Sequence, residues 1–464
     1  MNDCTIVLLG ASGDLAKRKL IPALYELIAH NTLTNFVVVG AAYDDTTAEH
    51  ILEQAKPFIT AYDQTVFDRL RERFVYQRVN FLKPDDFIVL EQEVTALERT
   101  YGLLGNRIIY VAAASHFFIP ITQAVAAAGL ARKLGVKDKT WHRIVYEKPF
   151  GEDAKTAHEI NQCIAHYFDE IQIYRIDHYL TKEIVGNIAL VRFTNCVFEP
   201  LWNNRYIDNV QIVLSEKIGL DGRGAYYDHY GALKDMVQNH VLELMALIGM
   251  ESPEKLTGEY IRKERIKVLE KIKVIDAVLG QYEGYHTEPH VDSHSKTETF
   301  ATALCMIENP RWAGVPFYIK TGKYLDKKET AIYIKFKQVD CLLTRNCPSD
   351  SNYLSIEVSP EAKFSLRLNV KKPGLTNDVT PVDMEFCHSC LFGPITPEAY
   401  EVIFEEVMKG EQSISVRCDE IEYAWKVIDA IKAMNLPVYT YARGLRGPQE
   451  ADQFARKHGM RWRS

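Results

Sequence analysis

The segment "YRIDHYLTKE" at residues 174–183 places four chemically active side chains within six positions. His178, Tyr179 and Lys182 can each donate a hydrogen bond to an anion such as a phosphate. The carboxylate of Asp177 can instead orient a base. A polar loop after a strand is the structural alternative. The segment therefore predicts an anion site, a proton-transfer site, or both.

A histidine that could be that base lies on a helical pattern over residues 231–249, which contains the stretch "KDMVQNH". Asp235 and His240 stand there among apolar residues, and a histidine in such a place is usually a structural, half-buried residue. A carboxylate partner would change this interpretation. Asp177 could hold His240 in the tautomer that leaves its other nitrogen free to take a proton.

A glycine turn near the N-terminus, "GASGDLAKRKLIPALYEL" at 10–27, follows an apolar strand and opens a helix. Gly10 and Gly13 permit a tight turn, and the helix N-terminus favours an anion, so the context predicts dinucleotide binding. The spacing is G-x-x-G and not the usual G-x-G-x-x-G, which leaves a purely structural turn as the alternative.

The stretch "EKPFG" at 147–151 also follows a strand. It places the cation Lys148 at the carboxyl end of a sheet, where doubly wound folds bind ligands. The bond before Pro149 is a candidate for the cis form. A proline-terminated strand with a surface lysine is the alternative.

Two other clusters offer weaker chemistry. His286, His290 and His294 recur every four residues, but Pro289 and its polar neighbours predict a loop without the shared helical face that ligation needs. The stretch "CHSC" at 387–390 has one C-x-x-C and no second pair. We therefore predict no metal site.

Composition limits the class of protein. The chain has 464 residues, 47% of them hydrophobic, and a net charge of −7, which argues against a general nucleic-acid binder. No stretch approaches the ~20 apolar residues of a membrane span, and the start "MNDCTIVLLGASGD" lacks the basic residues of a signal peptide. The cysteines are odd in number and scattered, which favours free thiols in a reducing cytoplasm. They are residues 4, 163, 196, 305, 341, 347, 387, 390 and 418.

Two kinds of sheet must position these residues. Up to about residue 177, short β-branched runs alternate with helical patterns, as in "TIVLLG", "NFVVVG" and "RIIYV", which predicts a Rossmann-like, doubly wound parallel sheet. Beyond 298, strand-like runs follow one another without connecting helices, which predicts a large, mostly antiparallel sheet with helices. We expect a dinucleotide-binding domain at 1–177 and an α+β substrate-binding and dimerisation domain at 178–464.

The motifs "GASGDLA", "EKPFG", "RIDHYLTKE", "GRGAYYDHYGALKDMVQNH" and "KTGKYL", in this order, resemble the glucose-6-phosphate dehydrogenase family over nearly the whole chain. The resemblance implies oxidation of glucose 6-phosphate at C1 to 6-phosphoglucono-1,5-lactone, the first step of the oxidative pentose phosphate pathway. Hydride would pass to NAD or NADP, and no metal would be needed.

The resemblance also implies residue roles. His240 is the general base, and Asp177 orients it. The predicted substrate-binding residues are Lys148, His178, Tyr179, Lys182, Glu216, Asp235 and Lys323, of which Lys148 also contacts the cofactor. The predicted cofactor-binding residues are Gly10, Ser12, Gly13, Asp14, Leu15, Tyr43 and Lys148.

Some positions depart from the family pattern. Ala114 and Ser115 replace a usual Pro-Pro, and Ala225 stands where the family prefers Gly. Tyr43, followed by Asp44 and Asp45, replaces an Arg that pairs with the 2′-phosphate of NADP. We therefore expect NAD to be accepted and preferred. The alternative is that Lys17, Arg18 or another base reaches the phosphate.

Two other functions remain open: a dehydrogenase for another hexose or hexose phosphate, and a non-catalytic paralogue. The intact His178, Tyr179 and Lys182 argue against the first, and the intact Asp177 and His240 argue against the second. By resemblance we also expect a homodimer or a dimer of dimers, formed through the large sheet, and no second, structural NADP site.

Overall fold

The computed structural model describes residues 3–135, 138–338, 352–375, 378–387, 390–391, 393 and 397–463. The chain forms two compact units. Unit 1 comprises Met1–Thr181, Thr257–Arg262 and Pro397–Cys418, and unit 2 comprises Lys182–Leu256, Lys263–Thr396 and Asp419–Ser464. Within the described ranges, no helix has both the length and the apolar character that a membrane span requires.

Sheet A of unit 1 has six parallel strands in the order β3-β2-β1-β4-β5-β6, which confirms the predicted doubly wound sheet. The order reverses between β1 and β4, where such folds bind nucleotides. The strands are β1 Cys4–Leu9, β2 Phe36–Ala42, β3 Phe74–Arg78, β4 Arg107–Val111, β5 His142–Glu147 and β6 Ile173–Ile176.

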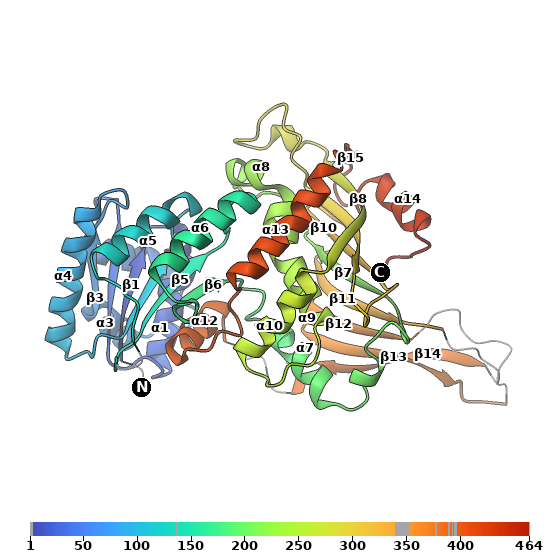
Figure 1. Cartoon of the computed structure of the whole chain (residues 1–464), viewed down its shortest axis with the longest axis horizontal. Coiled ribbons are helices and arrows are strands. Elements are labelled where there is room, and N and C mark those ends of the chain that lie inside the picture. Colours follow the sequence, from blue (N-terminus) through green and yellow to red (C-terminus); the bar gives the residue numbers. More distant parts are fainter. Residues whose placement is uncertain are drawn as a thin grey trace. The chain divides into compact units, whose positions relative to one another are not determined.

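Helices shield sheet A, whose central strands β1, β2 and β4 are buried at every position. Strands buried on both faces are rich in Val, Ile and Leu, as these are. In Figure 1, α5 and α6 lie side by side, and α1 lies beside α3 and α12. The helices of this unit are η1 Ala16–Leu20, α1 Ile21–Ala29, α2 Ala48–Ala55, η2 Lys56–Phe58, α3 Gln64–Glu72, α4 Pro84–Tyr101, η3 Ser115–Phe117, α5 Phe118–Ala127, α6 Ala154–Tyr167, η4 Glu170–Gln172 and α12 Ala399–Lys409.

Sheet B of unit 2 has nine strands in the order β14-β13-β12-β11-β7-β10-β9-β8-β15. All neighbours are antiparallel except the parallel pairs β7–β10 and β8–β15, which confirms the predicted, mostly antiparallel sheet. The strands are β7 Ile207–Ser215, β8 Ile272–Tyr282, β9 Phe300–Ile307, β10 Pro316–Gly322, β11 Glu329–Phe336, β12 Tyr353–Ser359, β13 Lys363–Lys371, β14 Val379–Cys387 and β15 Val438–Tyr441.

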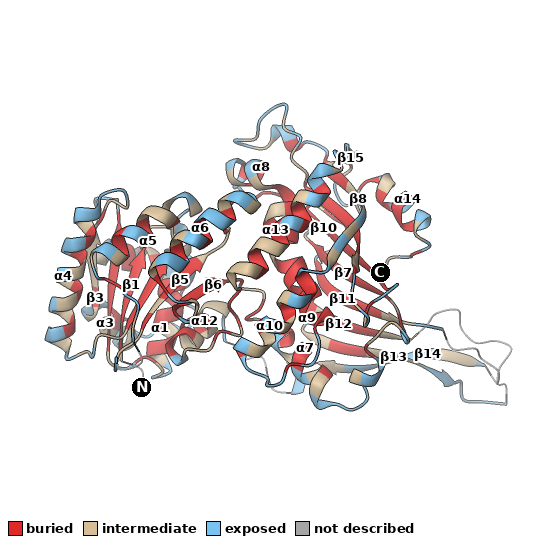
Figure 2. Cartoon of the chain, viewed as in Figure 1, coloured by how far each residue is buried: buried red, intermediate tan, exposed pale blue. Residues whose placement is uncertain are grey.

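The core of unit 2 lies between sheet B and its helices. Every residue of α9 is buried, and Figure 2 shows the central strands of the sheet buried while the outer parts of β13 and β14 are exposed. The remaining helices are α7 Glu183–Thr194, η5 Glu199–Leu201, α8 Gly224–Ala232, η6 Leu233–Val241, α9 Leu242–Gly249, α10 Gly258–Leu269, η7 Tyr285–Thr287, α13 Cys418–Ala433 and α14 Gln449–Lys457. Of these, α10 begins in unit 1, and Cys418 belongs to that unit.

The predicted single helix at 231–249 is wrong in detail. Gly231 has a φ of 67° and breaks the helical backbone near the end of α8, and the nine residues Leu233–Val241 form the π-helix η6 before α9 begins. A Cβ at Gly231 would lie 2.6 Å from a carboxylate oxygen of Glu298. That same oxygen accepts a hydrogen bond of 2.9 Å from the backbone N–H of Leu233. Glu298 therefore caps the π-helix, and the cap leaves no room for a side chain at Gly231.

Two cysteines correct the prediction of free thiols. Cys387, the last residue of β14, forms a disulfide with Cys390, and their Cα atoms lie 5.2 Å apart. Cys4, Cys163, Cys196, Cys305 and Cys418 are free. Cys341 and Cys347 lie outside the described residues.

Candidate active site

The turn after β1 needs glycine at its first position. Gly10 has a φ of 104°, and a Cβ there would lie 2.3 Å from the carbonyl oxygen of Ala112. The backbone N–H of Gly10 donates to Ala41 at 2.7 Å, and that of Gly13 donates to Gly10 at 3.0 Å. The chain thus turns tightly between β1 and η1, with Leu15 as the residue that precedes the helix. The arrangement suits a dinucleotide pyrophosphate at a helix N-terminus.

The end of β2 carries an acid toward this turn. The hydroxyl of Ser12 donates to the carboxylate of Asp44, while the ring of Tyr43 is 62% exposed. Arg78, at the end of β3, donates to the carbonyl of Tyr43 at 2.9 Å, and its guanidinium lies 5.1 Å from the centre of the Tyr43 ring. The acid beside the turn is therefore Asp44.

Arg18, one of the two candidate cations near the turn, is also engaged. The guanidinium of Arg18 pairs with Asp14 at 2.7 Å, and both side chains are largely exposed. Arg18 also lies 5.2 Å from the ring centre of Phe58. The ion pair joins residues four positions apart and holds the side chain of Asp14 on the first turn of the helical segment.

The end of β5 holds an acid next to the predicted cation. The hydroxyl of Tyr110 donates to Glu147 at 2.5 Å. Burial raises the pKa of Glu147 to about 7, against the hydrogen bond from Tyr110 and the charge of Lys148, which lower it. The bond between Lys148 and Pro149 is cis. Glu147 was not predicted as a site residue, although it stands in the motif "EKPFG".

The chain turns sharply after β6, within the segment "YRIDHYLTKE". A carboxylate oxygen of Asp177 accepts the backbone N–H of Tyr179 at 2.9 Å, and only 2% of Asp177 is exposed. The ring centres of His178 and Tyr179 lie 5.1 Å apart, and both side chains are partly exposed. Lys182 is the N-cap residue of α7. The turn thus buries the acid and leaves the anion-binding candidates nearer the surface.

In unit 2, Glu216 and Lys323 meet because β7 and β10 are parallel neighbours. Ser215 is paired with Gly322, so the next residues leave the same end of the sheet. The ammonium of Lys323 donates to Glu216 at 2.5 Å and is nearly inaccessible to solvent. These two predicted substrate-binding residues therefore lie together.

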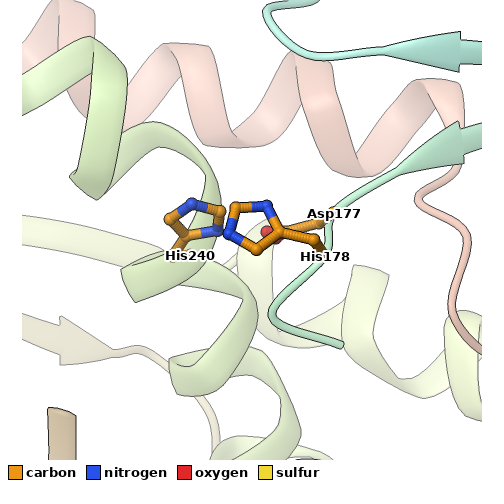
Figure 3. A group of neighbouring side chains, drawn as sticks. All are labelled: Asp177, His178 and His240. Carbon is orange, nitrogen blue, oxygen red and sulfur yellow. The ribbon is translucent and has the colours of Figure 1, made fainter. Parts of the chain in front are cut away.

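The π-helix η6 aligns two further predicted residues of unit 2. A π-helix closes its turn between residues i and i+5, so Asp235 and His240 lie on one face of η6. Both are buried, and Asp235 accepts a hydrogen bond of 3.3 Å from the hydroxyl of Tyr226. Figure 3 shows His240 on this helix, and Asp177 and His178 on the segment that follows β6.

Three of the positions that depart from the family pattern lie at or near the starts of helices. Ala114 precedes the short helix η3, of which Ser115 is the first residue. Ala225 lies in the first turn of α8. The three histidines of the weak cluster do not share a helix: His286 lies in η7, and His290 and His294 follow it in a loop.

Comparison with known proteins identifies the family. Residues 7–187 match the model "Glucose-6-phosphate dehydrogenase, NAD binding domain", and residues 189–463 match "Glucose-6-phosphate dehydrogenase, C-terminal domain". The chain belongs to the glucose-6-phosphate dehydrogenase family. This family consists of NAD(P)-dependent oxidoreductases that act on the CH-OH group of glucose 6-phosphate.

Two bacterial glucose-6-phosphate 1-dehydrogenases match over nearly their whole length. The chain is 37% identical to glucose-6-phosphate 1-dehydrogenase of Chlamydia pneumoniae, over 99% of this chain and 96% of that protein. It is also 37% identical to the Bacillus subtilis enzyme, over 98% and 97%. A solved glucose-6-phosphate dehydrogenase in complex with glucose 6-phosphate superimposes with a TM-score of 0.91 at 30% identity, covering 100% of this chain and 99% of that chain.

Proposed function

We propose that this chain oxidises glucose 6-phosphate at C1 to 6-phosphoglucono-1,5-lactone and passes the hydride to a nicotinamide. The observation that carries the proposal is the ion pair between the buried Lys323 and the partly exposed Glu216. It lies in the same unit as the π-helix that presents Asp235 and His240 on one face. Such a set offers a cation for a phosphorylated sugar, carboxylates for its hydroxyls and a base for a proton.

The proposed chemistry starts at the C1 hydroxyl. Hydride leaves C1 as the hydroxyl proton leaves, and a base whose pKa lies near neutrality suits that step. We assign this role to His240 and the orientation of its ring to Asp177. The burial of both side chains supports the assignment, because a base screened from water keeps its orientation.

The substrate phosphate is assigned to His178, Tyr179 and Lys182, with Lys323 at the sugar-phosphate end. The phosphate of glucose 6-phosphate is attached at C6 and not at the reacting C1, so the energy of binding it serves to orient that carbon. Glu216 and Asp235 would accept hydrogen bonds from sugar hydroxyls. Lys148, at the carboxyl end of β5, would contact both sugar and cofactor.

The cofactor is proposed to lie on residues 1–177, against Gly10, Ser12, Gly13, Asp14 and Leu15, with its adenosine ribose beside Tyr43. We propose NAD as the preferred form. The carboxylate of Asp44, held by Ser12, suits the 2′-hydroxyl of NAD and repels a 2′-phosphate. Arg18 is paired with Asp14, and Arg78 with the carbonyl of Tyr43, which supports NAD over NADP.

A substrate panel tests the proposed function. Nicotinamide reduction is measured with glucose 6-phosphate, with glucose and with other hexose phosphates. Glucose 6-phosphate should give the highest kcat/KM by far. A preference for glucose or for another hexose phosphate would assign a related dehydrogenase, and no turnover with any sugar would assign a non-catalytic paralogue.

We also propose that residues 178–464 dimerise through sheet B. A groove of about 500 Å³ is lined by apolar side chains that include Phe198 and Leu366. These two also line a second hollow of about 460 Å³, together with Met384, whose side chain is 62% exposed. Apolar surface of this kind is typical of an interface.

Light scattering tests this interface. The variant Met384→Lys should show a shift from the dimer, or dimer of dimers, toward the monomer. An unchanged mass would contradict this interface.

The proposed location is the cytoplasm. Five of the seven cysteines that the structure describes are free thiols, which suits a reducing compartment, although Cys387 and Cys390 are paired. Cell fractionation tests this location. Recovery outside the cytoplasmic fraction would contradict it.

A further inference from the structure

Two side chains of unit 2 interact with the ammonium of Lys323. It donates to Glu216 at 2.5 Å, and it lies 4.9 Å from the ring centre of Tyr227, a residue of α8. Lys323 and Tyr227 are each 2% exposed. The ammonium is thus held between a carboxylate and an aromatic face, away from water.

The backbone of Lys323 is fixed separately. The hydroxyl of Tyr441 donates to the carbonyl of Lys323 at 2.7 Å, and the N–H of Lys323 donates to the carbonyl of Thr299 at 3.0 Å. With the backbone held, the direction of the ammonium depends on Glu216 and Tyr227 alone among these contacts. The two differ in kind, because Glu216 can pair with a sugar hydroxyl whereas the ring face cannot.

The ring of Tyr227 keeps the character that attracts a cation. Burial, together with the charges of Asp235 and Glu216, raises the pKa of Tyr227 well above its ordinary value, so the phenol stays neutral. A neutral ring presents a negative face to a cation within about 6 Å of its centre, and the attraction grows when water is excluded.

We propose that Tyr227 is a positioning residue for substrate binding: its ring face keeps the ammonium of Lys323 in place when Glu216 turns to the sugar. The inference rests on the proposed function, since it assumes that Lys323 contacts the sugar phosphate. A cation that is already ordered loses little conformational freedom on binding, so its contribution appears in substrate affinity.

Two substitutions at one position test the ring face. Tyr227→Phe keeps the ring and should leave the KM for glucose 6-phosphate within about twofold of wild type. Tyr227→Leu removes the ring face and should raise that KM about ten- to thirtyfold, since a desolvated cation–π contact contributes up to about 2 kcal/mol. In both variants kcat should change less than KM, and the KM for the nicotinamide should stay unchanged. A rise of equal size in both variants would overturn the proposal.

The Lys323→Ala background separates this inference from the proposed function. Lys323→Ala alone should raise the KM for glucose 6-phosphate, and adding Tyr227→Leu should raise it no further. If Lys323→Ala leaves the KM unchanged, the assigned role of Lys323 fails. If it raises the KM but Tyr227→Leu acts equally with and without Lys323, only the positioning role fails.

A fluorinated series covers the case in which Tyr227→Leu does not fold. Phenylalanine analogues with increasing numbers of ring fluorines at position 227 keep the ring volume while they weaken its negative face. The KM for glucose 6-phosphate should rise with each fluorine. A KM that is independent of fluorination would overturn the positioning role.

Discussion

Tyr110 on β4 donates its hydroxyl to the carboxyl group of Glu147 on β5 at 2.5 Å. The pair lies at the carboxyl end of sheet A, next to Lys148 in sequence, and Asp177 on the neighbouring strand end adds to the raised pKa of Glu147. One acid at this edge therefore titrates near neutrality.

Glu147 makes stability depend on pH. Its pKa rises from 4.5 to about 7 on folding, so the folded chain holds the proton more tightly. The stabilisation is complete below about pH 4.5 and is lost as pH rises through about 7. Glu147→Gln removes this titration, so its stability relative to wild type should increase by about 3 kcal/mol across that window. Denaturation midpoints across the pH range measure it, and a pH-independent difference would refute it.

His240 should control the chemical step. His240→Asn should keep the fold and sugar binding yet lower kcat at least ~10²-fold, the usual contribution of a general base. Asp177→Asn should cost less, because it disturbs the orientation and charge of the base without removing it. Steady-state kinetics and ligand-induced shifts in Tm give the two readouts. If His240→Asn keeps a kcat near that of wild type, His240 is not the general base.

Lys182 should act on the phosphate alone. Lys182→Ala should raise the KM for glucose 6-phosphate about tenfold or more, since a charge-assisted hydrogen bond contributes about 1.5–3 kcal/mol. Its effect on unphosphorylated glucose should be small. Lys155→Ala is the matched control, because the side chain of Lys155 is 83% exposed on α6. Equal losses on both sugars would exclude a phosphate contact.

Tyr43 should set the choice of nicotinamide. The wild type should show a higher kcat/KM for NAD than for NADP, and Tyr43→Arg should shift the ratio toward NADP by supplying a partner for the 2′-phosphate. Asp44→Ala should weaken NAD use, because the acid proposed for the ribose hydroxyl is lost. A wild-type preference of tenfold or more for NADP would mean that another base reaches the phosphate.

The sheets could be predicted from the sequence, because short apolar runs such as "TIVLLG" are typical of buried parallel strands. The partners of Lys323 could not: Glu216 is 107 positions away, and the contact depends on the parallel pairing of β7 with β10. The π-helix was also missed, since an apolar pattern with helical spacing does not distinguish one π segment from an α-helix.

The segment Pro397–Cys418 belongs to unit 1, although it lies far along the chain from the rest of that unit. No pattern in its own sequence predicts this. Ser415 bridges to Ile176 at the end of β6, and the ring of Phe404 lies 5.3 Å from that of Tyr110. Both contacts join residues more than two hundred positions apart. Such pairings follow from the assembled core and not from the spacing of residues along the chain.

Transfer of the C1 hydrogen tests the central claim most directly. Glucose 6-phosphate that carries deuterium at C1 is incubated with the protein and the oxidised nicotinamide, and the reduced nicotinamide is analysed by mass spectrometry. The account predicts one deuterium in each reduced nicotinamide and none in the solvent. Reduced nicotinamide without deuterium, or no reduction with this sugar, would contradict it.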